Sequence, residues 1–154
     1  MKKFLKMFFA LLAIVLILAQ FIRPLRTNPV ADKSKDISSS FVMPSNVKQI
    51  LERSCYDCHS NNTRWPWYSN IAPVSWLIAR DVNDGREQLN FSEWGSYEQT
   101  DQITYLEDIC KNIKKGEMPM QKYLILHSDA KLSDADKDII CKWTKAMSDS
   151  LMNN

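Results

Sequence analysis

The sequence predicts an all-α domain preceded by one N-terminal transmembrane helix. Three observations predict this class. Four segments carry apolar residues at helical spacing, no segment alternates apolar and polar residues as a half-buried strand does, and a long apolar run opens the chain. The 154 residues include only three glycines, which is few for a β-rich protein with many turns. A chain of this length is expected to form one domain.

The first 24 residues, MKKFLKMFFALLAIVLILAQFIRP, begin with lysines and continue with an unbroken apolar run from Met7 to Ala19. As a helix, Phe4 to Ile22 would span about 28 Å, close to the ~30 Å hydrocarbon core of a bilayer. No small-x-small cleavage site follows, so we expect residues 1–24 to be an uncleaved transmembrane signal anchor. A cleaved signal peptide is the alternative. The lysines favour an N-in orientation, which places the remainder on the periplasmic or exterior side of a bacterial cytoplasmic membrane.

The next segment, residues 25–44, is polar, contains Ser and Pro and has no periodicity, which is typical of a flexible linker. The folded domain should therefore occupy residues 45–150. Its first helix is expected to begin at a capping Ser45 and to run into Cys55. Three apolar residues of this helix share one face: Val47, Ile50 and Leu51.

Three further helices are predicted downstream. One reads PVSWLIARDVNDG, with Pro73 in its first turn and Gly85 as its C-terminal stop. The next runs from about Tyr97 to Lys115 and ends at Gly116. The last opens with a capping box at 133–136. The loops between these helices are long, and a domain this small orders such loops more easily around a large buried ligand.

The segment RSCYDCHS places Cys55, Cys58 and His59 within five positions. Cys-x-x-Cys-His is the attachment pattern of a c-type haem. Two cysteines three apart can reach both vinyl groups of one haem, and the adjacent histidine then lies under the iron as proximal ligand. A structural zinc site needs about four ligands, and a thioredoxin-like pair follows a strand, so both alternatives are weaker. A simple disulfide between Cys55 and Cys58 remains a further alternative. We expect one haem c, covalently attached through both cysteines.

A haem held by His59 has a sixth coordination position, for which the chain offers Met118, Met120 and His127. We expect His59 and Met118 to be the iron ligands, because Pro119 fixes the backbone beside Met118 and blocks continuation of a helix. Met120, His127 and an open position remain alternatives. A thioether ligand raises the haem potential relative to bis-histidine ligation.

Two long segments, CYDCHSNNTRWPWYSNIAPVSWLIARDVNDGREQLNFSEW and GEMPMQKYLILHSDAKLSDAD, resemble the small membrane-anchored haem-binding domain family of c-type cytochromes. The resemblance covers about residues 45–145 and in gross order is similar to class I cytochrome c. It implies a cytochrome c-like helical domain with long haem-wrapping loops. It also implies that the carbonyl of Pro73 accepts a hydrogen bond from His59. The first helix should cross the last, with Ile50 and Leu51 near Ile140 and Trp143.

Aromatic residues follow the haem motif, and a large ring with a polar edge is suited to a haem pocket. Trp65, Trp67 and Trp76 are therefore expected either to line the haem or to serve as ordinary core residues. Cys110 and Cys141 are expected to form a disulfide, because two spare cysteines outside the cytoplasm pair more often than they stay free.

The charge distribution bears on possible partners. Formal net charge is +2, and no basic stripe suggests nucleic acid binding. Four lysines near the Met118 loop are expected either to form a solvated face or to steer an acidic redox partner protein: Lys111, Lys114, Lys115 and Lys122.

The sequence thus predicts a membrane-tethered monohaem c-type cytochrome that transfers electrons and is not an enzyme. The alternative is a haem-based sensor whose sixth ligand can be displaced. A peroxidase would need a distal base and an arginine near the iron, and only His127 is spare.

Overall fold

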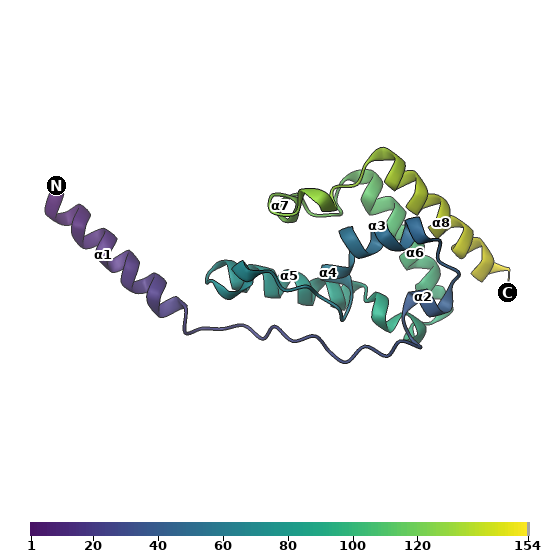
Figure 1. The fold of residues 1–154 in the computed structure, drawn as a ribbon, viewed down its shortest axis with the longest axis horizontal. Coiled ribbons are helices and arrows are strands. Elements are labelled where there is room, and N and C mark those ends of the chain that lie inside the picture. The colour runs from purple at the N-terminus through teal and green to yellow at the C-terminus, as the bar shows by residue number, and fades with distance from the viewer. Residues whose placement is uncertain (154) are drawn as a thin grey trace.

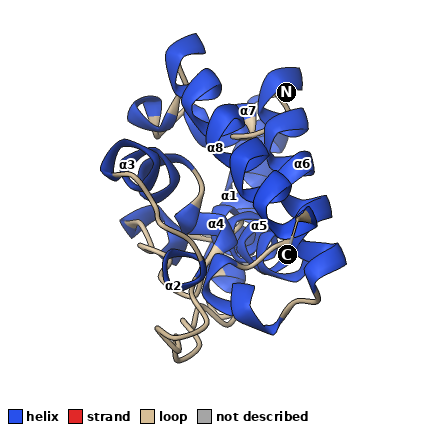
Figure 2. Ribbon diagram, turned by 90° about the vertical axis from the view of Figure 1, so that its right-hand side faces the viewer, coloured by secondary structure: helices blue, strands red, loops and turns tan. Residues whose placement is uncertain are grey.

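The computed structural model describes residues 1–153, which form helices and loops without any strand (Figure 2). The all-α prediction is therefore confirmed. The elements in chain order are α1 (Lys2–Ala19), α2 (Ile37–Ser40), α3 (Ser45–Ser54), α4 (Tyr56–His59), η1 (Trp67–Asn70), α5 (Val74–Gln88), η2 (Phe91–Ser96), α6 (Gln99–Lys115), α7 (Gln121–Leu124), η3 (Ser128–Ala130) and α8 (Asp134–Met152).

The N-terminal helix corrects the fold-class prediction. α1 lies away from the other helices (Figure 1) and buries none of its residues. Within residues 1–153, no helix has both the length and the apolar character needed to cross a membrane. The predicted transmembrane helix is therefore wrong. α1 ends at Ala19 and includes Lys2, Lys3 and Lys6. The uninterrupted apolar part that remains is about 20 Å long, against the ~30 Å of a hydrocarbon core.

The core of the domain forms where three helices meet. α6 packs along α8, and α3 packs against α8. Ile50 and Leu51 of α3 belong to the same buried cluster as Ile140 and Trp143 of α8. The expected packing of the first domain helix on the last is thus confirmed.

The segment between α1 and α3 has many contacts with the domain, although we expected residues 25–44 to be a flexible linker. Ile37 of α2 is fully buried in the core cluster. The Gly95 N–H donates to the Lys35 carbonyl over 2.8 Å. Arg86 of α5 donates to the Thr27 carbonyl at 2.9 Å and to the Asn28 side chain at 2.8 Å. The folded unit therefore includes residues well before Ser45.

Most predicted helix ends agree with the structure to within two residues. α6 ends where Gly116 adopts the left-handed conformation with φ 74°, and α8 begins with a complete capping box between Ser133 and Asp136. α3 differs slightly, because Pro44 occupies the cap position and Ser45 is the first helical residue. α5 continues past Gly85 to Gln88, so the glycine is not a stop.

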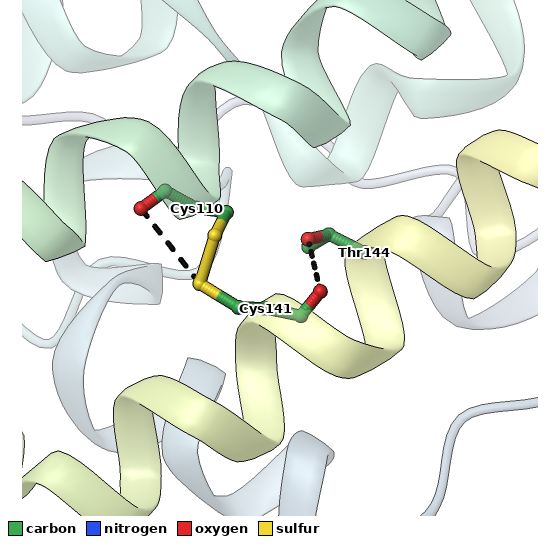
Figure 3. Close-up of a disulfide and its surroundings, with 3 residues drawn as sticks. All are labelled: Cys110, Cys141 and Thr144. Atoms are coloured by element: carbon green, nitrogen blue, oxygen red, sulfur yellow. Dashed lines mark hydrogen bonds between the residues drawn. A yellow bond between two sulfur atoms is a disulfide. The ribbon is translucent and has the colours of Figure 1, made fainter.

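A disulfide joins α6 to α8 (Figure 3). Cys110 and Cys141, the two cysteines expected to pair, are bonded, with their Cα atoms 4.9 Å apart. The bridge fixes the C-terminal half of α6 against the middle of α8. The chain segment between the two helices, which contains Met118, is thereby closed into a loop.

Candidate functional site

The Cys-x-x-Cys-His motif forms a tight turn directly after α3. The N–H groups of Cys58 and His59 both donate to the Cys55 carbonyl, at 3.2 and 2.9 Å. The resulting short helix α4 packs on α5. A β-carbon on Gly85 would lie 2.7 Å from the Cys58 carbonyl oxygen. Only a glycine at this position of α5 lets the backbone of the motif come so close.

Two adjoining cavities of about 350 and 320 Å³ lie beside the motif. Both volumes are in the range of small-molecule and cofactor sites. Residues from three separate chain segments line both cavities: Ser54, Cys55, His59, Gln88, Met118 and Pro119. The structure thus brings together the motif and Met118, which are about sixty residues apart in the sequence.

The His59 ring is oriented by a backbone contact. Its Nδ1 lies 3.0 Å from the carbonyl oxygen of Leu89, the residue that follows α5. A carbonyl can only accept, so Nδ1 carries the proton and Nε2 is left with a free lone pair. Burial lowers the pKa of His59, which favours the neutral imidazole. A neutral imidazole held through its other nitrogen is the form in which histidine ligates metals.

The hydrogen bond predicted between His59 and Pro73 is therefore wrong. The Pro73 carbonyl instead accepts from the Trp76 N–H at 3.1 Å. Pro73 precedes the first turn of α5, whereas His59 packs at the opposite end of this 15-residue helix. The two ends of such a helix are about 22 Å apart, too far for a hydrogen bond.

Cys55 and Cys58 are free thiols in the structure. Burial raises the pKa of Cys55 to about 12 and that of Cys58 to about 11. A redox-active pair of the thioredoxin type needs a lowered pKa at the attacking thiol. Within residues 1–153, moreover, no cluster of three or more His, Cys, Asp or Glu side chains could hold a metal ion by itself. The raised thiol pKa values therefore do not support the redox-pair alternative, and the side chains of residues 1–153 do not support the zinc alternative.

The three predicted tryptophans do not line these two cavities. The indole N–H of Trp65 donates to Asn28 at 3.1 Å, and that of Trp76 donates to the Ile22 carbonyl at 2.7 Å. Trp67 is 75% exposed. Trp65 and Trp76 thus form hydrogen bonds with the segment that follows α1. The expectation that the three tryptophans line the cavities is not met.

Other residues, which the sequence did not single out, border the cavities in their place. Phe91, Tyr105 and Leu89 line the smaller cavity, and Tyr123 lines the larger one. Phe91 begins a short 3₁₀ helix, Phe91–Ser96, which is too short to show apolar residues at the spacing of an α-helix. Its position was therefore hidden from pattern-based reasoning.

The comparison with known families agrees with this geometry. The family model of the haem-binding domain matches residues 14–146. The chain belongs to the haem-binding domain family. No curated protein and no solved structure matches the chain. The match begins well before residue 45, in keeping with the contacts that residues 25–44 make with the domain.

The residues around the cavities fit a haem. Two unbonded thiols lie three positions apart, a neutral imidazole presents a free Nε2, and a thioether borders the same space. The hydroxyl oxygen of Ser54 is buried without a hydrogen-bond partner beside both cavities. A buried polar group of this kind calls for an explanation, and a polar atom of a bound cofactor would supply one.

Proposed function

We propose that this protein is a monohaem c-type cytochrome that transfers electrons. The observation that carries the proposal is the convergence of Cys55, His59 and Met118 on the same two cavities. Thioether bonds from Cys55 and Cys58 would attach the haem, and His59 and Met118 would ligate its iron. The haem supplies the change of oxidation state, and the protein supplies its binding and surroundings.

The residues of the site have separate tasks in this proposal. The Leu89 carbonyl holds the His59 ring through Nδ1, which would leave Nε2 free to ligate the iron of a bound haem. Gly85 allows the motif to pack directly on α5, and this contact fixes the position of His59 relative to the cavities. Phe91 and Leu89 line the smaller cavity and would provide apolar walls that limit the access of water to a bound haem. If His59 and Met118 both ligated the iron, the site would offer no coordination position to a substrate, and we propose that the protein catalyses no bond rearrangement.

We also propose that the haem domain works outside the cytoplasm. Disulfides form and persist in oxidising compartments, and the Cys110–Cys141 bridge supports this location. A lysine-rich start followed by apolar residues is likewise typical of exported bacterial proteins.

The proposed partner is a redox protein that docks near the Met118 loop. Lysines surround this loop, as the sequence indicates, but three of the four are paired with acidic neighbours. Lys111 pairs with Asp108, Lys115 with Glu117 and Lys122 with Asp81. This pairing weakens the local positive field, so we do not assign the docking to charge steering alone.

The test is to produce the full chain in a host that can attach haem c. Mass spectrometry of the denatured protein should show one added haem, and Cys55→Ala/Cys58→Ala should abolish it. The ferric protein should show the weak red band of a haem with a sulfur ligand. That band should disappear in Met118→Ala and persist in the matched control Met120→Ala.

Two results would contradict the proposal. A denatured protein that has lost all its haem would show that attachment is not covalent. A high-spin spectrum in the unmodified chain, with ready binding of carbon monoxide after reduction, would show an open sixth position and favour the haem-based sensor.

A further inference from the structure

The segment that follows Met118 is tied to three different parts of the domain. We call residues 121–127, which comprise α7 and the next turn, the distal segment. Lys122 contacts Asp81 of α5 at 2.8 Å, and His127 shares a hydrogen bond of 2.6 Å with Tyr68 of η1. The third contact joins the segment to the haem motif itself. The hydroxyl of Tyr123 donates to the Asp57 carboxylate over 2.9 Å.

Asp57 stands between the two motif cysteines in the sequence CYDCH. Its side chain is only 14% exposed and also accepts from the Arg64 backbone and guanidinium at 3.1 and 3.2 Å. The carboxylate is thus held in place independently of Tyr123. A hydrogen bond to such a fixed, charged acceptor is stronger than one between neutral groups.

The chain around Met118 is anchored on its other side by α6. The N–H groups of Glu117 and Met118 both donate to the Asn112 carbonyl, at 3.0 and 3.4 Å. Downstream, the Tyr123 N–H donates to the Met120 carbonyl at 2.9 Å, which couples the tyrosine to the loop. Met118 therefore lies between a helix end and a tyrosine that reaches the haem motif.

We propose that Tyr123 and Asp57 are positioning residues for the sixth ligand. Their hydrogen bond links the loop of Met118 to the motif of His59, so that the two sides of the site move as one unit. Opening of the loop must break this bond, and the bond thereby opposes replacement of Met118 by an external ligand. The inference rests on the proposed function, in which Met118 ligates the iron.

The experiment is a titration of the ferric full-length protein with imidazole. Tyr123→Phe removes only the hydroxyl and keeps the ring, whose centroid lies 4.1 Å from the centroid of the His127 ring. We expect the same haem mass and the same red band as in the unmodified chain, with imidazole affinity raised about tenfold by the loss of a charge-assisted hydrogen bond. Asp57→Asn, which keeps an acceptor but loses the charge, should raise the affinity less.

The matched comparison is Tyr68→Phe, which removes a hydroxyl bonded to the same distal segment but not to the motif. We expect a smaller rise in imidazole affinity. The proposal is overturned if Tyr123→Phe binds imidazole as the unmodified chain does, or if Tyr68→Phe has an equal effect. Combining Tyr123→Phe with Asp57→Asn should add little to the single tyrosine variant, and full additivity would also overturn it.

The two proposals fail in different ways. If the red band persists in Met118→Ala, the ligand assignment is wrong and the positioning role falls with it. If the band depends on Met118 but imidazole affinity is unchanged in Tyr123→Phe, the cytochrome proposal stands and only the positioning role is refuted. Urea unfolding of each variant shows whether a change in affinity reflects a damaged fold.

Discussion

Gly85 and Cys58 lie so close together that a β-carbon on the glycine would be 2.7 Å from the Cys58 carbonyl oxygen. A glycine in the interior of a helix costs up to about 1 kcal/mol relative to alanine. α5 carries this cost because the backbone of the haem motif rests on it at this point. The glycine that lowers the stability of α5 is thus the residue that allows the motif, and with it His59, to pack closely on this helix.

Gly85→Ala should therefore destabilise the protein, although the same change in an ordinary helix stabilises it. The new methyl group must push the motif away from α5, at an expected cost of about 1–3 kcal/mol in the free energy of unfolding. Urea unfolding followed by far-UV circular dichroism measures this. Asn83→Ala, at an exposed position of the same helix, is the control and should leave stability unchanged or slightly higher. A Gly85→Ala protein as stable as the unmodified chain would show that the motif can shift freely.

Local sequence signals predicted much of the fold and singled out residues that the structure brings together in the candidate site. Gly116 and the capping box of α8 specify helix ends within a few residues, so α6 and α8 could be placed. The Cys-x-x-Cys-His motif and the Met118–Pro119 pair are equally local. Their convergence on one pair of cavities was expected, because His59 and Met118 were predicted to bind the same iron.

The predictions failed where contacts between residues far apart in the sequence determine the structure. The partner of His59 depends on which end of α5 meets the motif, and no local pattern encodes that choice; the structure selects Leu89 rather than Pro73. The predicted membrane-spanning segment was extended to Ile22 from hydropathy alone, whereas helix α1 ends at Ala19. In residues 25–44 the polar composition concealed Ile37, a single apolar residue that reaches the core.

Ile37→Ala should test whether the segment before α3 belongs to the folded unit. Removing a fully buried isoleucine leaves a cavity and typically costs about 2–5 kcal/mol. Val42→Ala is the control, because Val42 is in the same segment but 90% exposed. We expect a clear decrease in thermal midpoint for the first variant and almost none for the second. Equal midpoints in both variants would mean that Ile37 contributes no more to the stability of the domain than an exposed residue of the same segment.

Loss of the Cys110–Cys141 bridge should destabilise the domain by about 4 kcal/mol, because its 31-residue separation restricts the unfolded chain. Cys110→Ser/Cys141→Ser should thus have a lower urea midpoint than the unmodified chain under oxidising conditions. Addition of a thiol reductant is the control, since it should lower the midpoint of the unmodified chain and leave that of the double variant unchanged. A double variant that still responds to the reductant would point to another bond as the sensitive one.

The link between α8 and α3 should make stability depend on pH. Asp136 accepts hydrogen bonds from the backbone N–H of Ser133 at 2.9 Å and from Arg53 of α3 at 3.2 Å. The bond from the Ser133 N–H, followed by the Ser133 hydroxyl and Arg53, lowers the pKa of Asp136 below its usual 3.8. The unfolded chain binds this proton more readily than the folded one. The Asp136 carboxylate therefore makes its full contribution to the free energy of unfolding above about pH 4. This contribution is lost as the pH falls through the lowered pKa of Asp136 in the folded protein.

Asp136→Ala should accordingly lower the free energy of unfolding near pH 7 by about 1 kcal/mol, because it removes one half of the capping box that Ser133 and Asp136 form at the start of α8. The difference from the unmodified chain should shrink once the pH falls below about 3.8. Urea unfolding over a series of pH values measures both quantities. Asp138→Ala, which removes an exposed carboxylate from the same helix, serves as the control and should show no such convergence. A difference between Asp136→Ala and the unmodified chain that stays constant down to the lowest pH would show that the charge of Asp136 does not contribute.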